Sequence, residues 1–356
     1  MKIYVYAICK NEEKFVNRWV ESMSEADGII VFDTGSTDNT VKLLSVYPKV
    51  TVYSEVIEPW RFDTARNRSL ELVPEDADIC VCTDLDEVFH KGWRHGFEKA
   101  YTKGVQLFSY RYTWSFNEDG SEGTVFNIQK AHARHGFTWK HPVHEVVTYT
   151  GEGCPVTVYA EGVLLDHHPD REKSRSSYLP LLELSVKEEP EDDRNMHYLG
   201  REYMYHGRNE DAIKTLLRHL SLPGAVWKDE RCASMRYIAK CYARMGNYTE
   251  AESWYLRACA EAPYLREPWM DFAFYCYTKE YWYSVIALVN KALEITYRPL
   301  NYISESENWG ALPFDLLSLA YHKTGNQKYA IKYCDKAIKI SPADERLRRN
   351  RIWFEK

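Results

Sequence analysis

Long hydrophobic runs are missing from the sequence, and so are the usual signals of export. No run approaches the ~18 uninterrupted apolar residues of a membrane-spanning helix. Residues 1–5 read directly as a strand, without the charged and apolar regions of a signal peptide. Proline and glycine are also scarce, at 14 and 17 of 356 residues, which argues against collagen-like and low-complexity chains. We therefore expect a globular protein that is neither exported by a signal peptide nor membrane-spanning.

The cysteines form no recognisable disulfide or zinc framework. There are nine, an odd number, mostly embedded in apolar runs such as residues 79–82, as is typical of reduced and buried thiols. Neither Cys-x-x-Cys nor His-Glu-x-x-His occurs, which argues against a zinc-type hydrolase. This pattern favours a reducing, cytoplasmic location. The net charge of −6 argues mildly against a general binder of nucleic-acid backbones.

Strands and helices alternate in the first part of the chain. Apolar runs predict four strands with helices between them, at residues 2–9, 28–33, 51–56 and 78–83. Such alternation predicts a mainly parallel sheet with helices on both faces, whose ligands collect at the carboxyl ends of the strands. The polar residues at these expected ends are Asn11, Asp33, Asp84 and Asp86. Residues 105–163 then read as strands rich in aromatic residues and valine, which we assign to a mixed second part of the same domain.

A helical repeat begins after about residue 171. Alignment of Gly207, Gly246 and Gly325 superimposes small and aromatic residues at the same offsets, as in 34-residue tetratricopeptide units. A fourth copy has Glu280 in place of the glycine. The spacing from Gly246 to Glu280 is 34 residues, but from Glu280 to Gly325 it is 45, which predicts an insertion at about 302–312.

These patterns divide the chain into three parts. We expect a catalytic α/β domain over residues 1–170, a connecting helix or linker over 171–192 and an all-α solenoid of tetratricopeptide-like repeats over 193–356. The concave face of such repeats can bind an acceptor, a protein partner or a second copy of the chain. The aromatic residues of the repeats are better explained by packing in the hydrophobic core than by binding a partner. They are Tyr198, Tyr203, Tyr242, Tyr255 and Trp269.

Paired acids supply the most informative short motif. Asp84 and Asp86 stand two residues apart just past a buried strand, where both carboxylates can reach one divalent ion. Alone, such a pair is as readily explained by a solvated loop after a strand.

Four motifs in order give the first 170 or so residues a resemblance to family 2 glycosyltransferases, which have the nucleotide-sugar-binding GT-A fold. The motifs are Cys9-Lys10-Asn11-Glu12-Glu13, Val31-Phe32-Asp33-Thr34-Gly35-Ser36-Thr37-Asp38, Phe62-Asp63-Thr64-Ala65-Arg66-Asn67 and Asp84-Leu85-Asp86. The resemblance implies a nucleoside-diphosphate sugar donor, UDP-linked in many members. It implies that Asp33 binds the base and that Arg66, with Asn11, Glu12 and Asp84, holds the nucleotide. It further implies that Asp86, beside Asp84, binds Mn²⁺ or Mg²⁺ at the diphosphate. Without this family resemblance, each residue also has a purely structural interpretation. Asp33 could start a turn, Asp38 could cap a helix and Arg66 could be a solvated helix residue.

Six of the twelve histidines lie between residues 132 and 168. Val143-His144-Glu145 and Leu165-Asp166-His167 resemble elements of sublancin-type peptide S-glycosyltransferases, which likewise join a family 2 domain to a helical-repeat tail. This resemblance implies that Glu145 or His144 lies beside the acceptor and that His167 completes the metal site. We expect an inverting hexosyl transfer in which Glu145 acts as the base and the metal stabilises the departing nucleoside diphosphate.

Other functions are compatible with parts of the sequence. A nucleotidyltransferase or metal hydrolase would use the same acids and histidines. An inactive nucleotide fold whose repeats bind a partner protein would be expected to have lost Asp84 and Asp86, yet both are present. The acceptor is left open among peptides or proteins, glycans, lipid-linked sugars and modified nucleobases, because acceptor choice depends on loop shapes.

Overall fold

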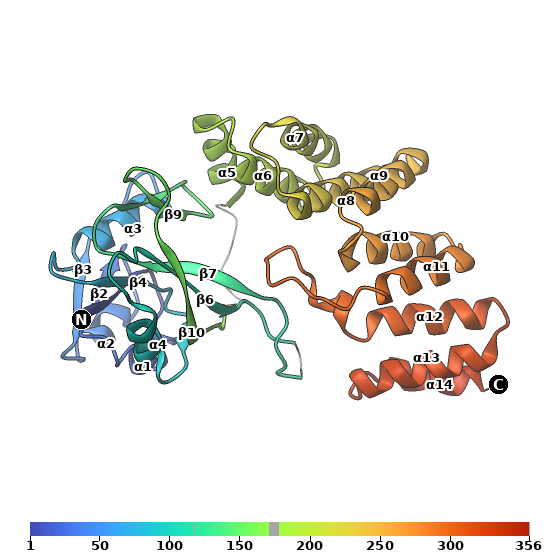
Figure 1. The fold of residues 1–356 in the computed structure, drawn as a ribbon, viewed down its shortest axis with the longest axis horizontal. Coiled ribbons are helices and arrows are strands. Elements are labelled where there is room, and N and C mark those ends of the chain that lie inside the picture. Colours follow the sequence, from blue (N-terminus) through green and yellow to red (C-terminus); the bar gives the residue numbers. More distant parts are fainter. Residues whose placement is uncertain (118, 171–177, 356) are drawn as a thin grey trace. The chain divides into compact units, whose positions relative to one another are not determined.

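The protein is described from a computed structural model that covers residues 1–117, 119–170 and 178–355. The chain separates into two compact units (Figure 1). The first unit comprises residues 1–117 and 125–185, and the second comprises residues 118–124 and 186–356. The start of the expected connecting segment, residues 171–177, lies outside the described residues.

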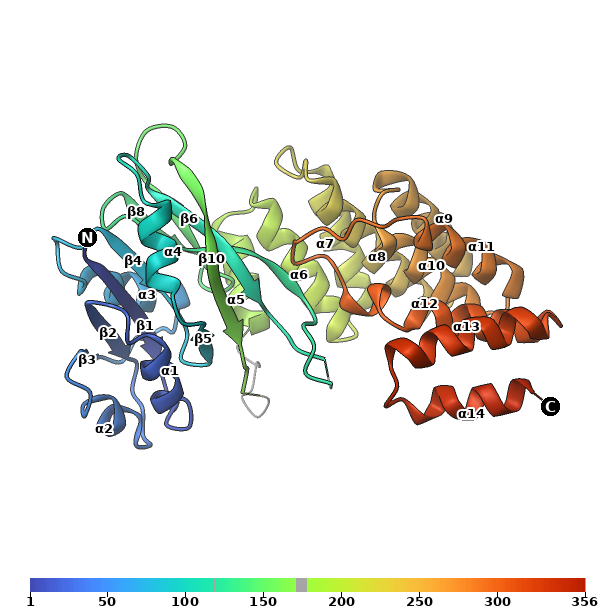
Figure 2. The same cartoon turned by 60° about the horizontal axis from the view of Figure 1, so that its bottom comes forward.

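An eight-stranded sheet organises the first unit, in the order β3-β2-β1-β4-β7-β6-β10-β5 (Figures 1 and 2). A separate two-stranded ribbon pairs β8 with β9. The strands are β1 Ile3–Cys9, β2 Gly28–Asp33, β3 Val50–Ser54, β4 Ile79–Cys82, β5 Glu87–Phe89, β6 Leu107–Thr113, β7 Val125–His132, β8 Phe137–Lys140, β9 Val146–Tyr149 and β10 Thr157–His167.

The pairing directions confirm a parallel half and a mixed half. β1 pairs in parallel with β2 and β4, and β2 pairs in parallel with β3. β7 then pairs antiparallel with β4 and β6, whereas β6 and β10 are parallel. Because β1 lies between β2 and β4, the loops after these three strands meet at one edge, where Cys9 is directly opposite Asp33.

Helices cover both faces of this sheet, as the alternating pattern predicts. They are α1 Val16–Ser22, α2 Thr40–Leu44, α3 Phe62–Glu71 and α4 Trp93–Ala100. Trp19 of α1 and Trp93 and Phe97 of α4 pack on one face, in a core that includes Val5 and Val81. On the other face, α3 and the β8–β9 ribbon pack on the alternate side chains of the same strands. The alternation of buried side chains on β1 and β4 therefore fixes where α3 lies.

Helical hairpins form the second unit. Its helices, after α5 Tyr178–Glu188 at the boundary, are α6 Asp193–Tyr205, α7 Asn209–Ser221, α8 Lys228–Arg244, α9 Tyr248–Glu261, α10 Arg266–Thr278, α11 Trp282–Leu293, α12 Leu312–Lys323, α13 Gln327–Ile340 and α14 Glu345–Phe354. Tyr198 and Tyr255 are buried, and Tyr203, Tyr242 and Trp269 pack against the core, which confirms their structural role. None of the described helices combines the length and apolarity needed to cross a lipid bilayer.

The same turn ends the first helix of each repeat. Gly207, Gly246 and Gly325 have φ angles of 72°, 77° and 78°, and Glu280 takes the same left-handed conformation with a φ of 59°. In each turn, the N–H of the residue that follows the left-handed position donates a hydrogen bond to the carbonyl oxygen five residues earlier. The Asn247 N–H, for example, donates to the Tyr242 carbonyl at 2.9 Å. This is the Schellman pattern of helix ends. The prediction that Glu280 replaces the repeat glycine is therefore confirmed by its backbone.

The expected insertion is present as a long connection between α11 and α12. It covers residues 294–311 and contains the 3₁₀ helix η1 Ser306–Trp309. Tyr302 stacks on Tyr198 of α6, with ring centroids 5.8 Å apart, and Glu305 accepts a hydrogen bond of 2.6 Å from Arg236 of α8. The insertion thus packs back onto the first repeats instead of extending into solvent.

Glu280 and Gly246 allow opposite predictions about stability. A non-glycine residue in the left-handed region costs roughly 1–2 kcal/mol. Glu280→Gly should therefore raise the free energy of unfolding of the second unit by about 1 kcal/mol, whereas Gly246→Ala should lower it by about 1 kcal/mol. Urea denaturation of the full chain measures both. Loss of stability in Glu280→Gly would contradict the proposed strain at this turn.

Candidate functional site

The loops after β1 and β2 are joined through hydrogen bonds. Asn11 has a positive φ of 56°, and its N–H donates to Ser36 Oγ at 2.9 Å. Its side-chain oxygen accepts the Thr37 N–H at 2.7 Å, and the Glu12 N–H donates to Thr40 Oγ1 at 2.7 Å. Asn11 and Glu12, two residues predicted to bind the nucleotide, therefore lie at the carboxyl edge of the sheet and shape its first loop.

Asp33 ends β2 at the same edge. Its carboxylate is buried and accepts hydrogen bonds from the N–H groups of Gly35, at 3.3 Å, and Ser36, at 3.1 Å. Asp38 lies just before α2, and its carboxylate accepts the N–H of Thr40, the first residue of that helix, at 2.9 Å. The N-cap residue of α2 is Asn39, so Asp38 supports the start of the helix from one position earlier than a capping residue. The contacts of Asp33 include the turn formation that its sequence context also allows.

A buried arginine joins two acids that are far apart in the sequence. Arg66 of α3 is only 4% exposed, and its guanidinium donates to Asp84 Oδ1 at 2.8 Å and to Glu145 Oε1 at 2.5 Å. Its guanidinium also lies over the ring of Trp139, 5.1 Å from the centroid. The two N–H groups face different carboxylates, so Arg66 fixes the position of the β8–β9 turn relative to the loop after β4.

Lys130 of β7, which belongs to none of the sequence motifs, completes this network. Its ammonium donates to Asp84 Oδ2 at 2.9 Å and to Glu87 Oε1 at 2.8 Å. Glu87 is fully buried and also accepts hydrogen bonds from Tyr112 and from the Asp84 N–H. A lysine inside a strand with buried neighbours was the available signal, but nothing in the sequence pairs it with acids more than 40 positions away.

The cations control the protonation of these acids. Burial alone would raise the pKa of Asp84, but Arg66 and Lys130 hold it well below its ordinary value. Burial raises the pKa of Glu87, and the neighbouring Asp84 charge adds to this effect against the opposing influence of Lys130. Asp84 is therefore a permanent anion with an ion pair on each oxygen.

Asp86 has a different partner, His167. Oδ2 of Asp86 lies 3.3 Å from Nε2 of His167, at the end of β10, where antiparallel pairing places His167 opposite Glu87 on β5. His167 Nδ1 lies 2.9 Å from the Trp114 carbonyl, which can only accept, so Nδ1 carries a proton and Nε2 faces the Asp86 carboxylate. Burial lowers the pKa of His167, but Asp86 raises it above its ordinary value.

This contact is chemically suited to a cation. An imidazole lone pair that faces a carboxylate is repelled unless a proton or a metal ion lies between them. A His–Asp pair whose second ring nitrogen is fixed by a carbonyl also has the outer-sphere support of many metal sites. Among the described residues, however, the ligand atoms of Asp84, Asp86 and His167 do not all come within 4.8 Å of one another. Asp84 is bound by two side-chain cations, which leaves Asp86 and His167 as the pair that fits a divalent ion.

The turn between β8 and β9 has an unusual backbone. His141 and His144 have positive φ angles of 78° and 51°, and with Asn11 and Glu280 they make up the non-glycine positive-φ residues of the described chain. His144 directly precedes Glu145, and its ring meets the edge of Tyr178 at 5.7 Å. Because such conformations persist only where surrounding contacts impose them, they mark this turn as a candidate functional element.

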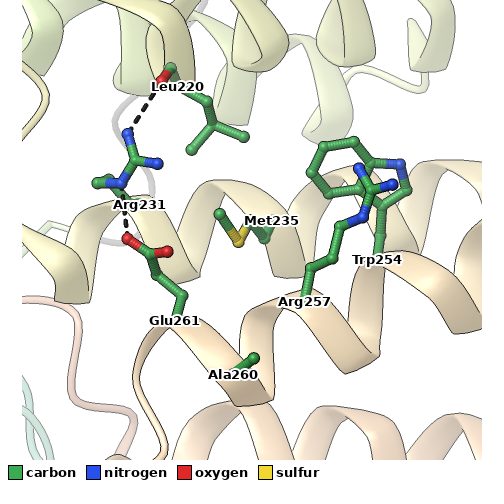
Figure 3. Close-up of a pocket in the computed structure, with 7 residues that line it drawn as sticks. All are labelled: Leu220, Arg231, Met235, Trp254, Arg257, Ala260 and Glu261. Atoms are coloured by element: carbon green, nitrogen blue, oxygen red, sulfur yellow. Dashed lines mark hydrogen bonds and ion pairs between the residues drawn. The ribbon is translucent and has the colours of Figure 1, made fainter. Parts of the chain in front are cut away.

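The second unit contains a separate hollow of about 440 Å³ among α7, α8 and α9 (Figure 3). Arg231 is bound there to Glu261 at 2.7 Å and to the Leu220 carbonyl at 2.9 Å, while Arg257 lies over the ring of Trp254. The seven residues that line the hollow include none of the predicted site residues. Its cationic groups are therefore engaged in packing within the repeats.

Comparisons with known proteins find different matches in the first and second parts of the chain. Residues 4–148 match the family model described as glycosyl transferase family 2, and tetratricopeptide repeat models match residues 199–265 and 314–344. A curated relative, the lipopolysaccharide core biosynthesis glycosyltransferase LpsC of Rhizobium meliloti (strain 1021), is 30% identical over 99 residues. The match spans 26% of this chain and 35% of LpsC, so it covers about a third of the length of that relative.

Solved structures resemble the chain only distantly. MamA is 17% identical, with 47% of this chain and 83% of MamA covered and a TM-score of 0.36. Yeast Tom70 is 16% identical, with coverages of 52% and 37% and a TM-score of 0.40. A thermophilic tetratricopeptide repeat protein of Thermus thermophilus is 16% identical, with coverages of 49% and 88% and a TM-score of 0.36.

Removal of Lys130 should strongly destabilise the first unit. Lys130→Met leaves Glu87 buried without its cation, and loss of one partner of a buried ion pair costs about 3–5 kcal/mol. The control is Lys99→Met, because the Lys99–Glu161 pair is exposed and exposed pairs contribute about 0–1 kcal/mol. Thermal and urea unfolding of both variants test the difference. Similar small losses in both would show that the Lys130 network does not hold the unit together.

Proposed function

We propose, from the premise that residues 4–148 form a family 2 glycosyltransferase domain followed by tetratricopeptide repeats, that the protein transfers a hexose from a nucleoside-diphosphate sugar to an acceptor. The observation that carries this proposal is the cluster at the carboxyl edge of the sheet. There Arg66 joins Asp84 to Glu145, and Asp86 faces His167. Crevices at this edge of α/β sheets are where nucleotide ligands bind.

The donor would bind along the loops after β1, β2 and β4. We assign contacts with the base, uracil for a UDP-linked donor, to Asp33, whose carboxylate is fixed at the loop start by the Ser36 N–H. Asn11 and Glu12 shape the adjoining loop, whose shared hydrogen bonds hold it in one conformation. Arg66 and Asp84 would position the nucleotide as a unit, because neither can move without breaking their 2.8 Å ion pair.

We assign a divalent cation, Mn²⁺ or Mg²⁺, to Asp86 and His167, with Asp84 beside them. When bound, such an ion neutralises the charge that develops on a diphosphate leaving group. Asp86 provides the hard oxygen ligand that both ions prefer. His167 is held by the Trp114 carbonyl so that Nε2 faces Asp86. Asp84, kept ionised by Arg66 and Lys130, adds negative charge to the same loop.

Glu145 is our choice for the catalytic base in an inverting transfer. Its carboxylate is held by Arg66 at the end of the β8–β9 turn, so it approaches the Asp84 loop from a separate element. In the reaction, Glu145 would accept the proton of the acceptor nucleophile as that nucleophile attacks the anomeric carbon and the nucleoside diphosphate departs. His144, strained and adjacent, would position the acceptor.

We assign acceptor or partner recognition to the repeats. Stacked helical repeats form extended surfaces that suit peptides and proteins, including a second copy of the chain. The name of LpsC refers to lipopolysaccharide core biosynthesis, which favours a glycan among the candidate acceptors, which are peptides or proteins, glycans, lipid-linked sugars and modified nucleobases.

The cation assignment predicts a loss of donor binding. Asp86→Asn should abolish the increase in melting temperature that the preferred nucleoside-diphosphate sugar produces with Mn²⁺, and should abolish transfer. Ligand at 100 times its Kd stabilises a protein by about 2.7 kcal/mol, which is readily measured by thermal unfolding with a panel of donors. Asp76→Asn, an exposed acid of the same unit, is the control. A donor shift that is independent of Mn²⁺ and unchanged in Asp86→Asn would refute the assignment.

The base assignment predicts unequal effects for two neighbouring variants. Glu145→Gln keeps a hydrogen-bonding side chain for Arg66 but cannot accept a proton, so kcat should fall about 10²–10⁴-fold with little change in KM for the donor. His144→Gln should mainly raise KM for the acceptor. Steady-state kinetics with both substrates varied separates these effects, and a larger loss of kcat in His144→Gln would move the role of base to His144.

A further inference from the structure

A second group of metal-type ligands lies inside the repeat unit, where none of the sequence motifs pointed. Asp193 begins α6, His219 lies in the last turn of α7 and Glu230 lies in the first turn of α8. The three helices α6, α7 and α8 pack against one another, which brings these helix ends together. One ligand atom from each residue lies within 4.8 Å of those of the other two.

The histidine of this group is rigidly oriented. His219 is completely buried, and its Nδ1 lies 2.9 Å from Ser234 Oγ. The same hydroxyl lies 2.8 Å from Nδ1 of His197, a second fully buried histidine. With Nδ1 bound to Ser234, His219 has only Nε2 to offer to Asp193 and Glu230.

Nε2 of His219 has a charged neighbour but no hydrogen bond. It lies 3.3 Å from Glu230 Oε1, yet it has no hydrogen-bond partner in the described part of the chain. A buried polar atom in this state is a free-energy cost, and natural proteins rarely retain one without a reason. The other carboxylate oxygen of Glu230 accepts a hydrogen bond from Tyr302 of the insertion, so Oε1 is the atom directed at His219.

We propose that Asp193, His219 and Glu230 bind one divalent transition-metal ion, for which Zn²⁺ is the best match. A nitrogen ligand with two carboxylate oxygens suits Zn²⁺, and three protein ligands leave one position for water. Ser234 and Tyr302 then act as outer-sphere partners that orient His219 and Glu230. The ion would tie α6, α7 and α8 together at the start of the repeat array. This site does not depend on the proposed transferase activity.

The competing explanation is a metal-free ion pair between His219 and Glu230. Burial would raise the pKa of Glu230, but His219 and Tyr302 lower it to about 2, so the carboxylate is ionised in either case. The two explanations differ in the third ligand, because an ion pair has no need of Asp193 at the same point. They also differ in the number of zinc ions bound per chain, because a metal-free ion pair binds none.

Zinc titration of the metal-stripped full chain tests the proposal. The Asp86→Asn background removes the contribution of the first unit, and competition with a chromophoric chelator gives the number of equivalents and Kd. We expect one equivalent, with a higher melting temperature in zinc. His219→Gln should lose this binding, and Ser234→Ala should weaken it about 10–100-fold because it removes only an orienting contact. His206→Gln, an exposed histidine of the same array, should bind like the parent.

The variants remain informative if one of them misfolds. Asp193 is half-buried at a helix start, so Asp193→Asn should keep the fold, checked by circular dichroism, while weakening zinc binding at least 10-fold. Absence of saturable zinc binding by the parent would overturn the proposal. Equal zinc affinity in the parent, Asp193→Asn and Ser234→Ala would also overturn it, because the ion would then be bound elsewhere.

Discussion

The first unit depends on one buried cation, the guanidinium of Arg66. A charge removed from water must be compensated, and here Asp84 and Glu145 compensate it at 2.8 and 2.5 Å. Because these acids belong to separate loops, the same ion pairs that make burial tolerable also fix the geometry of the candidate site. Lys130 repeats this arrangement on the far side of Asp84. Stability and site geometry therefore rest on the same contacts, and Asp86 with His167 is left beside them as the pair suited to a metal ion.

The second unit is stabilised in a different way, because the same helix-ending turn and the same core packing recur in each repeat. Each first helix of a repeat ends in the same left-handed turn, and the repeats bury small and aromatic side chains between them. The insertion departs from this regularity. In this insertion, Tyr302 donates a hydrogen bond to Glu230, and Glu305 accepts one from Arg236. The longest connection of the array therefore provides hydrogen-bond partners for polar groups of α8. The insertion contacts the candidate zinc site through the hydrogen bond from Tyr302 to Glu230.

Features of this chain that depend on local interactions could be predicted from its sequence, whereas those that depend on long-range contacts could not. Strands β1 to β4 were predicted within one or two residues, because their apolar runs are local and continuous. The turn at Glu280 was predicted because the repeat period locates it, even though its side chain gives no hint of a positive φ. The pairing of β7 between β4 and β6 was not predicted, since antiparallel insertion into a parallel sheet leaves no periodic signal. Lys130 and Glu87 were missed because 43 positions separate them in the sequence and only the folded sheet brings them together.

By itself, then, the sequence determined the alternating α/β unit, the repeat array and the identity of the acids and histidines after the strands, because each of these is set by local composition or period. Only the tertiary structure decided which of them act together. It divided the paired acids between Arg66 and Lys130 on one side and His167 on the other, and it brought Asp193, His219 and Glu230 to one point. These groupings join residues that are distant in sequence, and charge compensation in a buried environment selects them only once the chain is packed.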